Sequence, residues 1–279
     1  MTFSIVARDG AAWGVAVASK FLSVGSIVPE VRAGTGAVAT QAWGRYAYRA
    51  EVLDALSSGS PAPAALAAAL AADEGREHRQ LGVVGVDGAA THTGSECVPW
   101  AGGRTGGDGT TAYAIQGNIL TGPEVVDEME RAWLASAGRP LDHRLLDALL
   151  AGDAAGGDSR GRQSAALLAR APGAGYDRSG ILADLRVDDH PDAPAELARV
   201  HELHTLYFGA PEGVRSLDGE LRAEVRMLLD RLGRRTGEDT VEADLEAWMG
   251  EVNLETRLSP GGIDARVLEE LRREGGVVR

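Results

Sequence analysis

The chain has 279 residues, of which 44% are hydrophobic, so it is long enough to bury a sizeable core. Its formal net charge of -13 argues against a protein that binds nucleic acid through the phosphate backbone. A single cysteine, Cys97, excludes a disulfide framework, and no apolar run approaches the length that spans a membrane. No charged segment followed by an apolar one precedes the first expected strand, so we expect a cytoplasmic protein.

The first twenty residues predict a β-hairpin whose first strand begins at Thr2. Two short apolar runs flank Arg8-Asp9-Gly10, where glycine supplies the positive φ of a tight turn. Aminopeptidases remove Met1 when the next side chain is small, which would give Thr2 a free α-amine. The α-amine titrates at about pH 8. A hydroxyl beside such an amine is an activated nucleophile. The alternative is that Thr2 is only a strand residue.

Lys20 follows the hairpin and is the only lysine among 28 lysines and arginines. Lysine and arginine are not interchangeable where a compact charge or a tunable pKa is needed, so Lys20 is a candidate for a special role. A solvated lysine at the end of a strand is the alternative. The chain then predicts a strand near 26–31, a strand that ends at 40–43, and helices over 49–56 and 61–72.

A second hairpin is predicted over 79–86 and 89–93, across Asp87-Gly88. His92 lies on the opposite face of its strand from Thr91 and Thr93, so only one of these faces can meet a site. The glycine-rich segment 99–109 has no periodicity and is typical of a loop. A strand over 111–116 leads into Gly117-Asn118, where the amide of Asn118 is able to donate to a developing oxyanion; a turn residue is the alternative.

Helices are predicted over 123–137 and 141–150, followed by the glycine-rich segment 156–164. Glycines let the backbone approach a ligand, and Asp158 and Arg160 could hold its polar ends; a flexible connection is the alternative. Two strands separated by a loop at 172–180 come next. The second strand ends at Asp188-Asp189-His190, which indicates an electrostatic wall, a metal or a helix cap. We predict no metal, because hard cations need more oxygen ligands.

The order of elements predicts an α+β fold with two antiparallel sheets packed face to face and helices on each outer side, although periodicity leaves other α+β layouts open. This domain would end with a helix over 194–208. A linker over 209–213 precedes a small all-α domain, 214–279, with helices near 218–232, 240–252 and 263–274 and Trp248 as the core anchor.

Six short motifs stand in order between Thr2 and residue 208. They are Thr2-Phe3-Ser4-Ile5-Val6-Ala7, Gly36 to Ala42, Arg79 to Val84, Gln116-Gly117-Asn118, Ala155 to Gly161 and Arg186 to His190. Together they resemble the domain of unknown function 1028 family, which is placed in the N-terminal nucleophile (Ntn) hydrolase superfamily. Through Trp248, Asn253 to Arg257 and Ile263-Asp264, the C-terminal segment resembles a small peptidoglycan-binding-like domain.

The resemblance implies a four-layer αββα sandwich for residues 1–208 and an amidohydrolase that cleaves a C–N bond in a small amide or ureido compound through Thr2. It also implies that Lys20 assists Thr2, that backbone amides of Gln41 and Ala42 hold the oxyanion together with Asn118, and that Trp43 walls the site. A packed interior tryptophan is the alternative for Trp43. Further substrate-binding candidates are His92, Asp158, Arg160, Asp188, Asp189 and His190.

We expect a small-molecule substrate, no cofactor, no nucleic acid or membrane partner, and a homodimer. A different hypothesis is a non-catalytic ligand-binding or scaffold protein in which Thr2 is structural and Met1 is retained. A third hypothesis, hydrolysis through Cys97 and a histidine, would need a reactive thiol environment.

Overall fold

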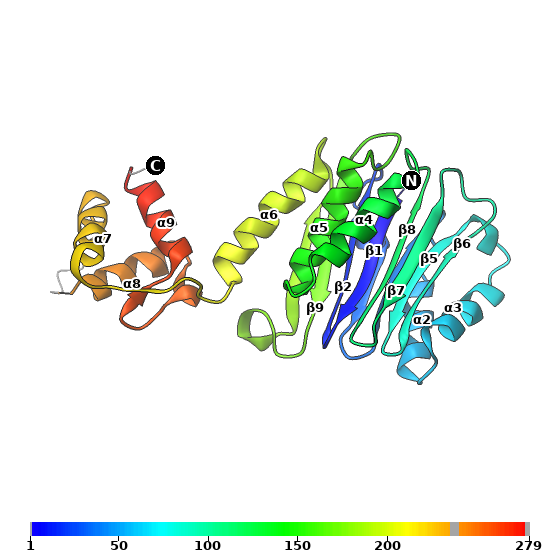
Figure 1. Ribbon diagram of the computed structural model, residues 1–279, viewed down its shortest axis with the longest axis horizontal. Helices are drawn as coiled ribbons and strands as arrows, with labels where there is room; N and C mark the ends of the chain where they lie inside the picture. Colours follow the sequence, from blue (N-terminus) through cyan, green and yellow to red (C-terminus); the bar gives the residue numbers. More distant parts are fainter. Residues whose placement is uncertain (1, 235–239, 277–279) are drawn as a thin grey trace. The chain divides into compact units, whose positions relative to one another are not determined.

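The computed structural model describes residues 2–234 and 240–276 (Figure 1). These residues form an α+β protein with antiparallel sheets and a C-terminal helical region. Two compact units divide the chain between Val200 and His201. The division therefore falls inside helix α6 (Ala193–Phe208), before the linker that we predicted at 209–213.

The first unit contains a six-stranded antiparallel sheet in the order β10-β9-β2-β1-β8-β7. The first hairpin is confirmed, and its strands β1 and β2 lie in the middle of this sheet. The strands are β1 (Thr2–Asp9), β2 (Ala12–Ser19), β7 (Gly102–Gly107), β8 (Thr111–Asn118), β9 (Ser164–Arg170) and β10 (Ile181–Val187).

A second antiparallel sheet has the order β3-β4-β5-β6. Its strands are β3 (Pro29–Arg32), β4 (Gly36–Gln41), β5 (Gln80–Gly85) and β6 (Gly88–Thr93). The segment before β3 differs from the prediction, because α1 (Val24–Ile27) occupies part of the expected strand. The predicted loop at 99–109 is also wrong, since β7 forms there by pairing with β8.

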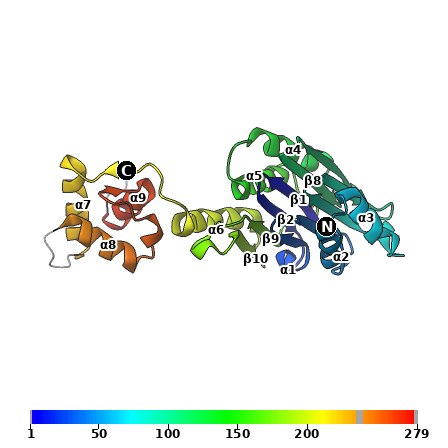
Figure 2. The ribbon, with the colours of Figure 1, turned by 90° about the horizontal axis from the view of Figure 1, so that it is seen from below.

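Three hydrophobic cores in the first unit show what covers each face of the sheets. Alternation in β1 sends Phe3, Ile5 and Ala7 into a core with α4 (Glu124–Ala135) and α5 (Leu141–Ala154). Val6 belongs to a second core that holds residues of both sheets. The third core joins the four-stranded sheet to α2 (Tyr48–Ser57) and α3 (Ala62–Ala71). In Figure 2, α4 and α5 lie on one side of the strands and α2 on the other.

The second unit has its own core around Trp248, which is 1% exposed and confirms the predicted anchor. Its helices are α7 (Gly219–Arg231), α8 (Val241–Glu251) and α9 (Ala265–Glu274). The all-α prediction is wrong in one respect, because β11 (Arg215–Ser216) pairs with β12 (Gly262–Ile263). Within the described residues, no helix is long and apolar enough to cross a bilayer.

Each hydrophobic core consists of residues from one unit. We therefore expect a chain that ends at Gly213 to fold and to melt cooperatively, with a midpoint within a few degrees of that of the whole chain. Thermal unfolding followed by circular dichroism measures this. Aggregation of the shortened chain would show that the two units share a core.

Candidate active site

Strand pairing fixes the position of Thr2. Thr2 lies at the start of β1, opposite Ser19 at the end of β2 and Asn118 at the end of β8. The residue is 7% exposed, and its Oγ1 lies 3.0 Å from the Oγ of Ser19. Because β1 has a hydrogen-bonded neighbour on each side, the hydroxyl is held by a central part of the sheet. Met1, whose removal we predicted, lies outside the described residues.

A cavity of about 670 Å³ includes Thr2 and Asn118 in its lining. The end of β4 and the following turn, Gln41 to Gly44, form another part of the lining. Four further segments complete it, and they include Phe21 and Val24, His78 and Arg79, Glu96 to Val98, and Arg160. This volume lies in the range of small-molecule sites.

A network of buried side-chain amides binds the backbone oxygen of Thr2. Gln41 is 2% exposed, and its Nε2 donates to the backbone oxygen of Thr2 at 3.1 Å and to Gln80 Oε1 at 2.7 Å. Asn118 Nδ2 donates to the same Thr2 oxygen at 3.4 Å and to the same Gln80 oxygen at 3.1 Å. The side-chain amide of Asn118 therefore positions Thr2 within the network, whereas we had expected it to hold an oxyanion.

The network extends between the two sheets through Ser4 and Gln116. Ser4 Oγ donates to Gln41 Oε1 at 2.7 Å and accepts from Gln116 Nε2 at 2.7 Å. Gly82 of the facing sheet leaves room for this amide, since a Cβ there would collide with the Gln116 side chain. Buried polar groups are costly unless they are paired, so this network ties the two sheets together in one register.

The turn after β4 has a strained backbone. Ala42 and Trp43 have φ values of 54° and 56°, and Ile119 on the opposite side of the lining has a φ of 51°. Such left-handed conformations cost side-chain-bearing residues about 1 to 3 kcal/mol each and cluster at functional sites. Trp43 is 82% exposed and lines the cavity, so the packed-interior alternative is wrong, and its role as a wall of a substrate site stays a prediction.

An ion pair holds this turn in place. Arg79 donates through Nη1 to the backbone oxygen of Trp43 and through Nε to Asp73 Oδ2 at 2.7 Å. Tyr48 donates its hydroxyl to the same Asp73 oxygen at 2.6 Å. Hydrogen bonds from Arg79 and Tyr48 lower the pKa of Asp73 far below its usual range, so the carboxylate stays charged. Burial raises the pKa of Tyr48 well above its usual range, so Tyr48 remains a donor.

Cys97 also lines the cavity, with His78 in the same lining. Its thiol lies 3.4 Å from the backbone oxygen of Arg79, to which it donates. Burial raises the pKa of Cys97, so the thiol keeps its proton at neutral pH. The reactive thiolate that hydrolysis through Cys97 requires is therefore not favoured.

Lys20 does not enter the cavity lining. Its Nζ donates to the backbone oxygen of Arg162 at 3.1 Å, and its backbone N–H donates to Asp158 Oδ2 at 2.7 Å. The structure therefore gives Lys20 the solvated strand-end position that we held as the alternative. Asp158 is buried and anchors this corner, whereas Arg160 lines the cavity as predicted for a substrate-binding residue.

Four other predicted residues lie outside the cavity lining. His92 Nε2 lies 3.1 Å from the backbone oxygen of Arg76, while Thr93, on the opposite face of β6, accepts from Gln80 in the buried network. Asp189 accepts from the Gln163 side chain, and His190 Nδ1 accepts from the Asp192 backbone. Asp188 contacts the α1 segment, where its backbone oxygen accepts from Ser23. The Asp189 carboxylate, the His190 imidazole and the Asp188 backbone therefore contact other parts of the chain.

Sequence reasoning missed the residues that support the site from outside β1. Gln80 and Arg79 begin the predicted second hairpin, and Ser19 ends the first, but no local pattern distinguishes them. The available signal was the buried, apolar character of these strands, in which a glutamine or serine must find a polar partner. We had quoted Arg79 and Gln80 only as part of a motif.

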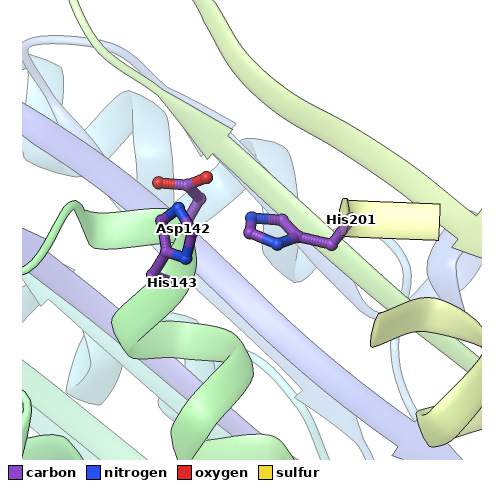
Figure 3. A group of neighbouring side chains, drawn as sticks. All are labelled: Asp142, His143 and His201. Carbon is purple, nitrogen blue, oxygen red and sulfur yellow. The ribbon is translucent and has the colours of Figure 1, made fainter. Parts of the chain in front are cut away.

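A separate group of titratable side chains lies at the start of α5. Asp142, His143 and His201 of α6 each offer one ligand atom, and these atoms lie within 4.8 Å of one another (Figure 3). His201 is assigned to the second compact unit. Three possible ligand atoms, one of them from a residue of the other unit, are weak evidence for a metal site, and we propose none there.

The fold and cavity define an α+β protein whose first strand begins at a buried threonine in a small-molecule-sized cavity. The chain belongs to the family of unknown function DUF1028, whose model matches residues 2–197. Residues 205–271 match the model described as "Putative peptidoglycan binding domain".

A crystal structure of a DUF1028 protein from Silicibacter pomeroyi is similar to this chain. The two are 30% identical, with 81% of this chain and 94% of the other covered and a TM-score of 0.65. A search of curated proteins finds no match.

The amide network predicts a large stability cost when its acceptor at Gln80 is removed. Gln80→Met keeps the volume but leaves the donors of Gln41 and Asn118 without this acceptor. Each unsatisfied buried group costs about 1 to 3 kcal/mol, which chemical denaturation measures. Gln163→Met is the control, because its amide donates to Asp189 at the surface. Equal stability of the two variants would contradict the role of the network.

The Asp73–Arg79 pair predicts a pH-dependent stability. Because the folded-state pKa of Asp73 lies below its ordinary value of 3.8, the stabilisation is complete above about pH 4 and declines as the pH falls through the lowered value. Asp73→Asn should be less stable at pH 7 by about 1 to 3 kcal/mol, and this difference should shrink from pH 4 to pH 2.

The control for this prediction is Asp54→Asn, which breaks the surface pair of Asp54 with Arg32. This pair is exposed, so we expect a change below about 1 kcal/mol. Urea unfolding at a series of pH values gives both comparisons. A difference between Asp73→Asn and the wild type that stays constant from pH 7 to pH 2 would contradict the assignment.

Proposed function

We propose that this protein is an N-terminal nucleophile hydrolase that cleaves the C–N bond of a small amide or ureido compound. The observation that carries the proposal is the hydroxyl of Thr2, which lies at the start of a central strand and in the lining of the cavity. In this proposal the two sheets and their covering helices correspond to the αββα sandwich of the superfamily.

The first requirement is removal of Met1, which gives Thr2 a free α-amine. With a pKa near about 8, this amine is partly neutral at physiological pH and is able to take the proton of its own hydroxyl. Ser19 Oγ, 3.0 Å from Thr2 Oγ1, orients the hydroxyl. Gln41 and Asn118 hold the backbone oxygen of Thr2, so the nucleophile is fixed before the substrate arrives.

In the reaction, Thr2 Oγ1 bonds to the substrate carbonyl carbon and the carbonyl oxygen becomes negative. The end of β4 and the strained turn after it line the cavity, and the backbone N–H groups of Gln41 and Ala42 remain our candidates to stabilise this oxyanion. The C–N bond then breaks, and the α-ammonium returns its proton to the leaving nitrogen. Water cleaves the resulting ester, which restores the hydroxyl of Thr2 and releases the acid. This chemistry needs no cofactor.

Replacement of Thr2 tests the nucleophile most directly. Thr2→Val keeps the β-branched shape and a small second residue but lacks the hydroxyl, so we expect turnover to fall by at least about 10³-fold. Thr2→Ser keeps the hydroxyl and should retain measurable turnover. Amine release from a panel of amides and ureides provides the assay.

Thr111→Val is the matched control for Thr2→Val, because it makes the same change in β8 opposite the other end of β1, where the Thr111 hydroxyl donates to Asp108 at the surface. It should keep turnover. Unchanged turnover in Thr2→Val would eliminate the mechanism and favour the alternative of a non-catalytic ligand-binding protein.

A further inference from the structure

The cavity at Thr2 presents an unusual amount of apolar surface to solvent. Four large hydrophobic side chains of its lining are exposed: Phe21 by 54%, Ile27 by 37%, Trp43 by 82% and Val98 by 52%. Single exposed apolar side chains are common on protein surfaces, but a group of them in one place often marks a ligand-binding groove. The two rings, Phe21 and Trp43, offer flat surfaces for the apolar part of a ligand.

The charge of the lining differs in sign from that of the chain as a whole. The chain has 41 acidic residues against 28 lysines and arginines. Among the described residues of the lining, however, two arginines, Arg79 and Arg160, stand against one carboxylate, Glu96. Both arginines also have a carboxylate partner just outside the lining, Asp73 and Asp158, so a negatively charged ligand would meet the exposed part of a guanidinium group and not an excess of positive charge.

The two arginines are not equivalent. Arg79 is bound closely to Asp73 at 2.7 Å, and its side chain is 21% exposed. Arg160 lies 3.4 Å from Asp158, and its side chain is 47% exposed. Asp158 also accepts from the backbone N–H of Arg160 at 2.9 Å, and Arg160 Nη2 donates to the backbone oxygen of Lys20 at 3.1 Å. The contacts with Asp158 and Lys20 thus orient Arg160, while much of its side chain stays exposed to solvent.

We propose that the cavity selects an N-acyl or N-carbamoyl amino acid with an apolar side chain. Arg160 binds its carboxylate, because the planar guanidinium matches carboxylate geometry, and Trp43 and Phe21 cover its side chain. Arg160 is therefore a specificity-determining residue. The identity of the cleaved bond rests on the proposed function, but the binding preference does not, because it concerns groups of the ligand away from Thr2.

Binding to a variant that cannot turn over separates the two proposals. Full-length Thr2→Ala is titrated calorimetrically with N-acetyl-L-leucine and with N-acetyl-L-leucinamide, in which a neutral amide replaces the carboxylate. We expect the carboxylate compound to bind at least about tenfold more tightly, which corresponds to about 1.4 kcal/mol. This preference should decrease with added salt.

Four second-site variants locate the preference. Arg160→Gln should remove the difference between the two compounds, and Arg160→Lys should keep part of it. Arg131→Gln, at an exposed pair with Glu128 on α4, is the matched control and should leave the difference intact. Trp43→Ala should weaken the binding of both compounds by a similar factor. Thermal unfolding verifies that each variant is folded.

Three outcomes would overturn the inference: no binding of either compound, equal binding of the two, or a preference that survives Arg160→Gln. Hydrolysis is measured separately, as leucine release by the wild-type protein. Selective binding without leucine release would count against the proposed function for this compound and leave the binding inference standing. Equally efficient deacetylation of both compounds, measured as leucine from one and leucinamide from the other, would support the hydrolase and would be a fourth result that overturns the selectivity.

Discussion

The hydrogen bonds of Gln41 and Asn118 to the backbone oxygen of Thr2 are the interaction on which the rest of the site depends. Both side chains also donate to Gln80 Oε1. The network therefore connects β1 and β8 of one sheet with β4 and β5 of the other. A network of this kind is stable only when its members are satisfied together. The position of Thr2 is therefore coupled to the register of both sheets, and a residue at the end of the chain acquires the rigidity of the core.

The same logic explains how a strained turn persists beside Thr2. Left-handed conformations at Ala42 and Trp43 disfavour the turn, whereas Arg79, which is itself held by Asp73, binds the backbone oxygen of Trp43 and stabilises the turn. Tyr48 donates to the same Asp73 carboxylate. Rigid support on both sides gives a site that is organised before a ligand binds. Preorganised backbone donors are what acyl transfer requires, and on this physical ground we propose a catalytic role for Thr2.

Hydrophobic alternation predicted the two hairpins and the helical period predicted the helices, because those segments carry their own periodic signal. Thr2 and Asn118 became candidates through the nucleophile argument and the family resemblance, and the structure places both in the cavity lining. The periodic signal missed β7, whose glycines do not alternate with apolar residues, and α1, which is too short to show a period. Lys20 stood out only by composition, and the packing of the Gly156–Ser164 segment directs its ammonium group to Arg162. Gln80 was hidden for another reason, because its partners are distant in sequence and only the paired sheets bring them together.

The central claim is that Thr2 carries a free amine and a reactive hydroxyl. The most direct measurement is the intact mass of the purified, untagged protein before and after exposure to a hydroxyl-directed acylating probe, with peptide mapping of any adduct. We predict a mass without Met1 and a single adduct on Thr2 that is absent from Thr2→Val. A protein that retains Met1 and takes up no probe at Thr2 would contradict the account.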